Sequence, residues 1–367
     1  MSDDGSMRQK TDGEVKRRKN SDGGGMSTFW IHTGAGPQTG FGHLGRCMIL
    51  AGELRDCAKA VFVLRPEDCW SGKSLMARGF EYRNIDFSDL WRHRDIHPAA
   101  ILIDTRFSTG LDAFIMTARE NGIPVLSLHD LGLNPVRSDI AVDGSIKGAR
   151  QRDLCDLPAQ RIFAGADYMV LDPAFRELRR RPLHVGNEIR SIFIGLGGGD
   201  ARNFYSLVLA GLRLWAAGAE REIEVVAMRG FVEWGQDDFN EESLRPLRFR
   251  WESGSAAGFI GAVDLAVTSG GISAYEALCS GIPLFALSWD SLQQTTIDLM
   301  AEAGSCVSLG PGDDLAPEFL AGLLGKLDGD VAARKKMARR GMEIVDGRGA
   351  ERVATILRRE ILAASKR

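Results

Sequence analysis

The sequence alternates short apolar runs, rich in Val, Ile and Leu, with segments that have the apolar spacing of helices. In the first half, helical spacing occurs at 44–54 and 111–120, and the apolar runs lie at 29–31, 60–64, 99–103, 124–128, 140–142 and 168–170. Continuous apolar strands separated by helices are typical of a parallel sheet covered on both faces. This half is therefore predicted to form a doubly wound α/β domain.

The same alternation restarts after the polar segment 179–190. Apolar runs follow at 191–196, 223–228, 249–251, 265–268 and 284–287, with helical segments at 203–217, 274–280 and 293–303. A chain of 367 residues exceeds what one core usually supports. We expect an α/β fold of the GT-B-like type, with two Rossmann-like doubly wound domains facing across a cleft. The expected boundaries are a disordered tail at 1–25, a first domain at 26–180, a linker at 181–190, a second domain at 191–349 and a helix at 350–367 that could cross back onto the first domain.

Charge and cysteine content limit the classes of binding partner and the cellular compartment that we expect for this protein. A net charge of −3 argues against nucleic acid as the main partner, since binding to a phosphate backbone draws on a clear basic excess. The six cysteines form no CxxC pair and no metal-ligand cluster with histidines. No apolar run approaches the length that spans a bilayer, and the N-terminus lacks the apolar stretch of a signal peptide. We expect a cytoplasmic protein, a monomer or weak homodimer, without a metal or cofactor.

The segment 40–46 is a glycine turn between the first predicted strand and the first predicted helix. Gly40 and Gly42 allow a ligand to approach the backbone, and His43 falls in the first helical turn. The free amides of that turn favour an anion and disfavour a second proton on the imidazole. A neutral histidine facing a phosphorylated ligand is a candidate general base. Taken alone, the turn fits a partly buried histidine that caps a turn better than a functional one, since small glycine motifs are weak signals.

Two further glycine turns follow strands of the second half. Gly198 and Asp200 belong to a turn after the run 191–196, which is either a ligand contact or a tight strand-to-helix connection. Gly270, Gly271 and Ser273 follow the run 265–268 and begin a helix, whose amides are suited to cradle a diphosphate. Glu276 lies one turn further along this helix, within reach of a ribose diol; the alternative is an ordinary surface glutamate.

Together these motifs resemble a known family. GxGHxxR at 40–46, GGxD at 197–200 and GGxSxxE at 270–276, followed by GIP, are similar to two-domain GT-B enzymes that use UDP-sugars. The sequence most resembles the UDP-2,4-diacetamido-2,4,6-trideoxy-β-L-altropyranose hydrolases of pseudaminic acid synthesis (PseG type) and related spore-coat polysaccharide proteins. The segments 164–175 and 346–353 also resemble this family, so that the similarity extends over nearly the whole chain from residue 27.

The resemblance implies displacement at the anomeric carbon of a UDP-linked amino sugar. His43 would deprotonate the attacking water, the amides at Gly270, Gly271 and Ser273 would stabilise the departing diphosphate, and Glu276 would hold the ribose. The remaining residues expected at the substrate are Gly40, Gly42, Arg46, Gly198, Asp200 and Gln293. Arg46 is either a phosphate or carboxylate ligand or half of a structural salt bridge.

The first domain departs from the family pattern at several places. Gly34 stands where the family has an acidic residue, and His32 replaces an arginine. The Asp-x-Tyr motif reads Asp104-Thr105-Arg106, and the Asn-Gln pair reads Leu292-Gln293. Sugar preference is therefore expected to depend on 32–38. His129-Asp130 either contacts the sugar or terminates a strand. Hydrolysis, glycosyl transfer from a UDP-sugar donor, and non-catalytic sugar-nucleotide binding all remain as functional hypotheses.

Overall fold

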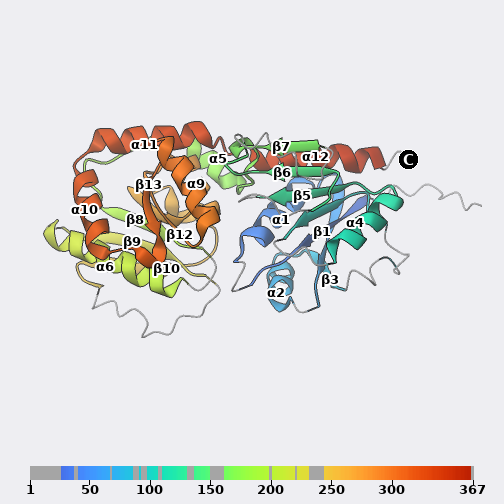
Figure 1. The fold of residues 1–367 in the computed structure, drawn as a ribbon, viewed down its shortest axis with the longest axis horizontal. Helices are drawn as coiled ribbons and strands as arrows, with labels where there is room; N and C mark the ends of the chain where they lie inside the picture. The colour runs from blue at the N-terminus through green and yellow to red at the C-terminus, as the bar shows by residue number, and fades with distance from the viewer. Residues whose placement is uncertain are drawn as a thin grey trace, which may run out of the picture.

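The chain folds into two α/β domains that lie side by side along the long axis of the molecule (Figure 1). The computed structural model describes residues 26–36, 40–66, 68–85, 91, 97–105, 110–129, 136–148, 161–197, 201–219, 221–230 and 244–364. The tail expected at 1–25 lies outside these ranges. No helix within them is long and apolar enough to span a membrane.

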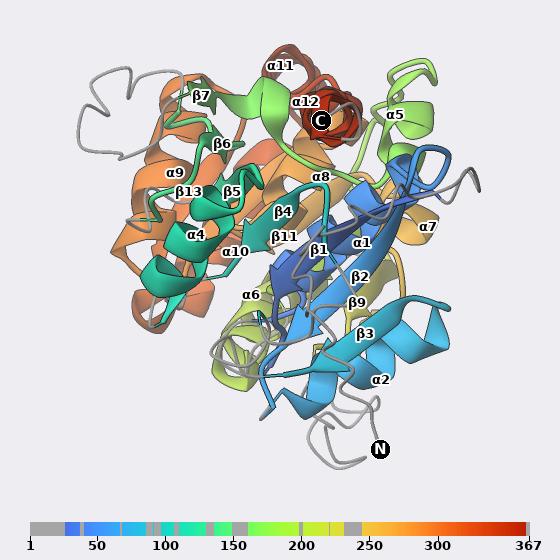
Figure 2. The ribbon, with the colours of Figure 1, turned by 90° about the vertical axis from the view of Figure 1, so that its right-hand side faces the viewer.

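The N-terminal domain is built on a fully parallel sheet of the order β3-β2-β1-β4-β5-β6-β7, seen from one edge to the other in Figure 2. Its strands are β1 (Ser27–Thr33), β2 (Ala58–Leu64), β3 (Glu81–Asn84), β4 (Ile101–Asp104), β5 (Val125–His129), β6 (Ile140–Asp143) and β7 (Arg161–Ala164). The helical elements of this half are α1 (Gly42–Glu53), α2 (Cys69–Ala77), α4 (Leu111–Glu120), the 3₁₀ turn η1 (Ala166–Tyr168) and α5 (Pro173–Arg179). Buried strands with apolar side chains on both faces explain the continuous apolar runs.

The C-terminal domain has a second parallel sheet, of the order β10-β9-β8-β11-β12-β13. Its strands are β8 (Ser191–Gly195), β9 (Ile223–Met228), β10 (Leu247–Glu252), β11 (Leu265–Ser269), β12 (Leu284–Ser288) and β13 (Val307–Pro311). The helices are α6 (Arg202–Gly218), α7 (Ala257–Ile260), α8 (Ile272–Ser280), α9 (Ser291–Glu302), η3 (Gly312–Asp314), α10 (Pro317–Asp328), α11 (Val331–Ile344) and α12 (Gly349–Ala364). The two parallel sheets confirm the predicted fold class.

The order of strands reverses at one place in each sheet. In the N-terminal sheet this is the β1–β4 pair, and in the C-terminal sheet it is the β8–β11 pair. Helices that follow the two strands of such a pair leave toward opposite sides, which opens a space beyond their carboxyl ends where open α/β sheets bind ligands. Helix α1 follows β1 and helix α8 follows β11, so both predicted motifs begin at a reversal point.

Some predicted elements differ from the structure. The run 168–170, expected as a strand, contains the end of η1 and a buried extended segment outside the sheet, while β7 lies earlier, at Arg161–Ala164. Met169 packs with residues of the C-terminal domain, which explains an apolar run without strand pairing. Helix α5 precedes the linker expected at 181–190, yet it packs against α7 and α8. The chain thus reaches the second domain before residue 181.

Helix α12 returns to the N-terminal domain and packs along α1 (Figure 1). Its residue Arg358 donates hydrogen bonds to both carboxylate oxygens of Asp56, at 2.6 and 2.9 Å, and to the carbonyl oxygen of Glu53. Where the chain crosses back, Gly349 lies directly against the backbone of Met169. The two crossings between the domains therefore pack on each other.

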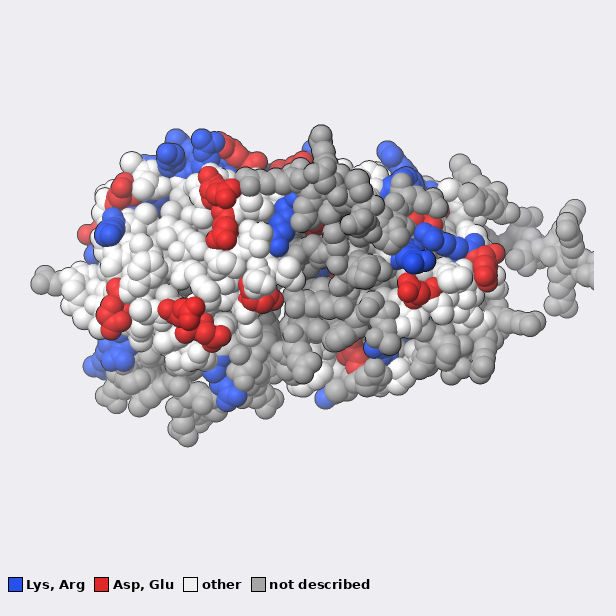
Figure 3. All heavy atoms as spheres, in the orientation of Figure 1, with Lys and Arg blue, Asp and Glu red and all other residues white. Residues whose placement is uncertain are grey.

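The surface charge is mixed. On the face drawn in Figure 3, Lys and Arg side chains occur together with Asp and Glu side chains over both domains. Within the described residues, exposed ion pairs include Arg180 with Glu177 and Arg340 with Glu343. Each such exposed pair contributes little to stability, about 0–1 kcal/mol.

Candidate active site at the domain junction

Helix α1 begins directly after a closed loop at the end of β1. Gly36 and Gly40 are joined by two backbone hydrogen bonds of 3.4 and 2.7 Å, and Gly40 has a φ of 70°, a conformation that favours glycine. Phe41, the N-cap residue, makes no side-chain capping bond. A Cβ on Gly42 would lie 3.1 Å from the side chain of Ile272 in α8. The glycines at 40 and 42 thus permit the loop and a close approach of the two domains.

His43 forms a buried pair with Asp104 at the end of β4. The Nδ1 atom of His43 lies 2.6 Å from Oδ1 of Asp104, and the Nη2 atom of Arg46 lies 3.0 Å from the same Nδ1. Arg46 has only donors, so only the carboxylate can accept a hydrogen bond from Nδ1. The geometry therefore assigns a proton to Nδ1, so that in the neutral ring the lone pair is on Nε2, which can then accept a proton.

Asp104 is ionised and held by one face of α1. Arg46 donates to both of its oxygens, through Nε at 3.0 Å and Nη2 at 2.7 Å, and the thiol of Cys47 lies 3.8 Å from Oδ2. Burial of the carboxyl opposes ionisation, but the Arg46 guanidinium and His43 outweigh it, so the pKa of Asp104 is below its usual value. Of the two roles open for Arg46, the structure displays the ion pair.

In the sequence, Asp104 stands out only as the first residue of Asp104-Thr105-Arg106, in which Arg106 takes the place of the tyrosine of the family pattern, and its pairing with His43 was not predicted. The two residues are 61 positions apart. The available signal was an aspartate at the carboxyl end of an apolar strand, and its meaning depended on knowing that β4 pairs with β1. Thr33, at the end of β1, is the register partner of Asp104, which brings these polar residues to one edge of the sheet.

In the C-terminal domain, the glycine turn after β8 lies close to the glycine turn after β11. A Cβ on Gly195, at the end of β8, would lie 3.4 Å from Ser273, and one on Gly197 would lie 3.6 Å from the hydroxyl of Ser269. Gly271 is the N-cap of α8 and provides no side-chain cap. The first amides of α8 therefore face the turn after β8 without a capping side chain, as an anion site requires. Gly198 and Asp200 lie outside the described residues.

Gly270 and Gln293 have local roles that the sequence did not reveal. A Cβ on Gly270 would lie 3.0 Å from both the carbonyl oxygen of Gln293 and the side chain of Ile297, so close packing against α9 accounts for this glycine. The Oε1 atom of Gln293 accepts a hydrogen bond of 3.2 Å from the backbone amide of Trp289, and the backbone amide of Gln293 donates to the carboxylate of Asp290. In this structure Gln293 thus stabilises the first turn of α9.

Glu276 is partly buried one turn into α8. Burial and the nearby carboxylate of Asp172 raise the pKa of Glu276 to about 7, and the hydrogen bond from Ser273 opposes this shift. A carboxyl with this environment changes charge close to neutral pH. As an ionised group it accepts hydrogen bonds from two hydroxyls through both oxygens, and protonation turns one of these oxygens into a donor.

The raised pKa predicts a pH dependence of stability. The folded protein retains the Glu276 proton at pH values where the unfolded chain, with the ordinary value of 4.5, has lost it. The contribution of Glu276 to the free energy of unfolding should therefore fall as the pH rises from 4.5 to about 7. Thermal unfolding of wild type and Glu276→Gln across this pH range measures the effect. As the pH rises, the unfolding temperature of wild type should fall relative to that of the variant. A constant difference would contradict the prediction.

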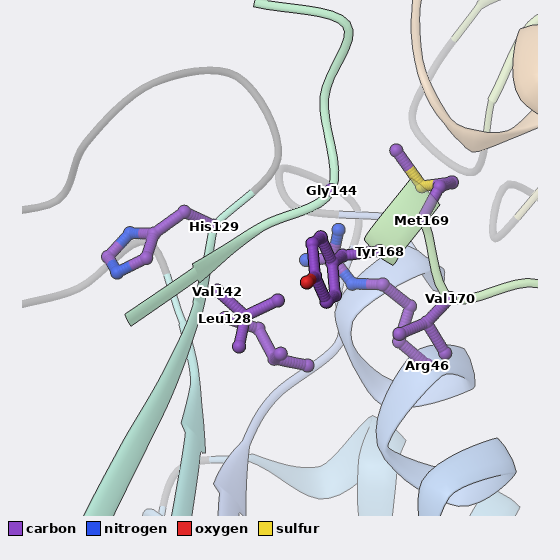
Figure 4. Close-up of a pocket in the computed structure, with 8 residues that line it drawn as sticks. All are labelled: Arg46, Leu128, His129, Val142, Gly144, Tyr168, Met169 and Val170. Carbon is purple, nitrogen blue, oxygen red and sulfur yellow. The ribbon is translucent and has the colours of Figure 1, made fainter. Parts of the chain in front are cut away.

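A small pocket adjoins the His43 site. It is lined by Arg46, Leu128, His129, Val142, Gly144, Tyr168, Met169 and Val170 (Figure 4). Arg46 and Tyr168 lie together at this pocket, whereas the His129 ring points away from them. The Nε2 atom of His129 lies 2.8 Å from the hydroxyl of Ser127, which shares its face of β5, whereas Leu128 lies on the other face. The ring is thus turned away from the side of the sheet that carries His43.

The loop after β1 is fixed by α2. The carboxylate of Asp68 accepts hydrogen bonds from the Ser71 hydroxyl at 2.6 Å and the Ala35 amide at 3.4 Å, and it lies 3.0 Å from the Cβ position of Gly34. A carboxylate is therefore adjacent to Gly34, the position where the family resemblance implies an acidic residue. His32 is buried, which lowers the pKa of its ring to about 4, and Nδ1 donates to the carbonyl of Val63. Pro37 and Gln38 lie outside the described residues.

Comparisons with known proteins agree with this architecture. No protein-family model matches the sequence. The spore coat polysaccharide biosynthesis protein SpsG of Bacillus subtilis is 27% identical over 267 residues, which cover 71% of this chain and 73% of that protein. An uncharacterized protein of Methanocaldococcus jannaschii is 24% identical over 296 residues, covering 77% of this chain and 60% of that protein.

Among solved structures, MurG of Acinetobacter baumannii has a TM-score of 0.66 at 14% identity, covering 91% of this chain and 100% of its own. A putative UDP-N-acetylglucosamine 2-epimerase of Listeria monocytogenes has a TM-score of 0.60 at 14% identity, covering 91% and 96%. UGT2 of Phytolacca americana, solved with UDP-2-fluoro-glucose, has a TM-score of 0.62 at 13% identity, covering 93% and 99%. The chain therefore has a two-domain fold of the GT-B type and is similar in sequence to a spore coat polysaccharide biosynthesis protein.

Proposed function

We propose that the protein is an enzyme of surface polysaccharide synthesis that hydrolyses a UDP-linked deoxy amino sugar at its anomeric carbon. The observation that carries this proposal is the buried His43–Asp104 pair, which leaves Nε2 of His43 as a base at the point where α1 approaches the uncapped amides of α8. The name of the Bacillus relative supports the process, and the UDP-sugar in the plant structure supports the substrate class.

The reaction needs one base and one anion site. Nε2 of His43 takes a proton from water, the water oxygen forms a bond to C1 of the sugar, and the bond between C1 and the diphosphate oxygen breaks. The electron pair leaves on UDP, whose diphosphate is stabilised by the amides at the start of α8. Glu276, when ionised, accepts hydrogen bonds from the ribose hydroxyls. Pseudaminic-acid-type sugar synthesis is the pathway that the sequence motifs suggest.

Glycosyl transfer is the second candidate, because structures with the same fold include a glycotransferase and a MurG protein. The catalytic groups would be the same in both reactions. A base that activates water equally activates an acceptor hydroxyl, so the nucleophile alone separates hydrolysis from transfer.

The decisive measurement follows UDP and free sugar from a panel of UDP-amino sugars, incubated with the protein in the absence of any acceptor. We expect UDP and free sugar to appear in equal amounts, at a rate that added acceptor saccharides leave unchanged. Release of UDP only when an acceptor is present would instead establish transfer. Binding of UDP without turnover under either condition would contradict both reactions and leave a non-catalytic sugar-nucleotide-binding protein.

A further inference from the structure

Lys147 extends from the N-terminal domain into the C-terminal domain. It follows β6 in the short segment 145–148, is 5% exposed, and its Nζ atom donates a hydrogen bond of 2.8 Å to the carbonyl oxygen of Leu292 in the first turn of α9. The preceding residue, Ile146, donates its amide to the hydroxyl of Tyr275 in α8 at 3.0 Å. The ammonium group is thus positioned at the junction by contacts to both helices that begin at the nucleotide-facing edge of the second sheet.

The carbonyl of Leu292 is a modest partner for a buried cation. It is a neutral acceptor inside a helix, and the hydroxyl of Thr296 also donates to it, at 3.3 Å. Hydrogen bonds between an ammonium and an anionic oxygen are roughly twice as strong as bonds between neutral groups. A phosphate oxygen would therefore compete well for the Lys147 ammonium.

Two carboxylates face Lys147, one from each domain. Asp143 accepts a hydrogen bond from the Ser145 amide at 2.8 Å, and Asp290 accepts one from the Gln293 amide, also at 2.8 Å. Both attract the ammonium, but burial outweighs them and the pKa of Lys147 is lowered. The structure therefore maintains a buried amine at a cost that these two carboxylates do not offset.

The surroundings beyond these carboxylates favour an anion. The amides at the start of α8, which no side chain caps, direct partial positive charge toward the junction, and Lys147 adds a full charge. The first turn of α9, by contrast, is already capped by the carboxylate of Asp290. Negative ligand charge would relieve the repulsion among these groups, and the long flexible lysine side chain can follow the ligand without a change of backbone.

We propose that Lys147 binds the diphosphate of the sugar nucleotide, exchanging the carbonyl of Leu292 for a phosphate oxygen, and so contributes to substrate binding from the first domain. The inference rests on the proposed function, because it assigns a further contact to the same ligand. It makes the diphosphate the group that both domains hold: α8 through its amides, and the segment 145–148 through one ammonium. Departure of UDP would return Lys147 to Leu292.

The test compares the affinities of the full-length protein for UDP and for uridine, measured by calorimetry for wild type, Lys147→Met and Lys147→Arg. Loss of one charge-assisted hydrogen bond is expected to raise the Kd for UDP by about tenfold in Lys147→Met, while the Kd for uridine stays the same. Lys147→Arg should recover most of the UDP affinity. Lys326→Met, which removes an exposed lysine of α10, controls for the change in net charge.

A purely structural lysine gives a different result. Lys147→Met would then lower the unfolding temperature and change the affinities for UDP and uridine by the same factor, so an unchanged UDP-to-uridine ratio overturns the inference. Failure of Lys147→Arg to recover any UDP affinity would also count against it. If the wild-type protein binds neither compound, the proposed function itself fails, which is distinguishable from the loss of Lys147 alone.

Discussion

Asp104→Asn is expected to slow UDP release from the sugar nucleotide on the order of 10²–10⁴-fold, the range that a positioned base contributes. Oδ1 of Asp104 accepts hydrogen bonds from both His43 and Arg46, and Oδ2 accepts from Arg46. Asparagine has one oxygen and one NH₂ group for these donors. If the oxygen faces Nε of Arg46, the NH₂ group faces Nδ1 of His43 and favours the tautomer whose Nε2 carries the proton. That imidazole cannot accept a proton from water.

The other orientation of the asparagine retains the His43 contact but places two donors against each other at Arg46. Either orientation leaves a buried guanidinium with poorer compensation, so the variant should also unfold at a lower temperature; breaking a buried ion pair costs about 3–5 kcal/mol. The rate of UDP release and the folded state of the variant must therefore be measured separately. UDP affinity is a suitable check of the fold, because the proposed nucleotide site consists of α8 and Lys147 and includes neither Asp104 nor His43.

The double variant Asp104→Asn/His43→Gln shows whether Asp104 acts through His43. Groups that work as one unit give strongly non-additive losses, so we expect the double variant to be no slower than His43→Gln alone. His184→Gln, at an exposed histidine outside the site, serves as the matched control and should retain the wild-type rate. Wild-type turnover in Asp104→Asn, or an added loss in the double variant, would refute the assigned role.

The fold could be predicted because its signals are local. A run such as 223–228 is apolar except for Glu224 and matches β9 residue for residue, since a strand of a covered parallel sheet buries most of both faces. The glycine turns also indicated where the helices begin: His43 and Ser273 both lie in first turns. Strand order follows no local signal, so the pairing of β4 with β1 and the contact between His43 and Asp104 could not be derived.

Contacts between the two domains could not be predicted from the sequence either, because they also have no local signal. Lys147 and Leu292 are 145 positions apart, and neither belongs to a recognisable motif. Conversely, a motif does not separate binding from packing. Gly270 is explained by its distance to α9, and Arg46 by its ion pair with Asp104. Residues of a motif share a spacing in sequence, but each has its own neighbours in the fold.

Gly349→Ala is expected to lower the unfolding temperature strongly. Gly349 is the first residue of α12, and a Cβ there would overlap the carbonyl oxygen of Met169 and lie 2.8 Å from its amide nitrogen. The obstruction is backbone, which cannot rotate away as a side chain does. Overpacking of this kind costs about 1–3 kcal/mol and occasionally more. We expect the upper part of this range, because Met169 is itself held by the close approach of Gly144, whose Cβ position lies 2.8 Å from the Cα of Met169.

Gly325→Ala provides the opposite case. Gly325 lies inside α10, and a Cβ at this position has no heavy atom within 4 Å. Alanine should therefore stabilise that helix by about 0.5–1 kcal/mol through its lower backbone entropy in the unfolded chain. Thermal unfolding of the two variants beside wild type should give shifts of opposite sign. Equal unfolding temperatures for Gly349→Ala and wild type would contradict the close packing of the two crossings.

The position of Gly349 also connects stability to the proposed chemistry. Both crossings between the domains pass this point, and α12 continues from it onto α1, the helix that carries His43. A side chain that separates the crossings should therefore move α1 relative to α8, and not only weaken the fold. If so, Gly349→Ala assayed well below its unfolding temperature will lose more turnover than UDP affinity, because affinity depends on α8 and Lys147, whereas turnover also needs His43 in place against α8. Equal losses of affinity and turnover would show that the crossing serves stability only.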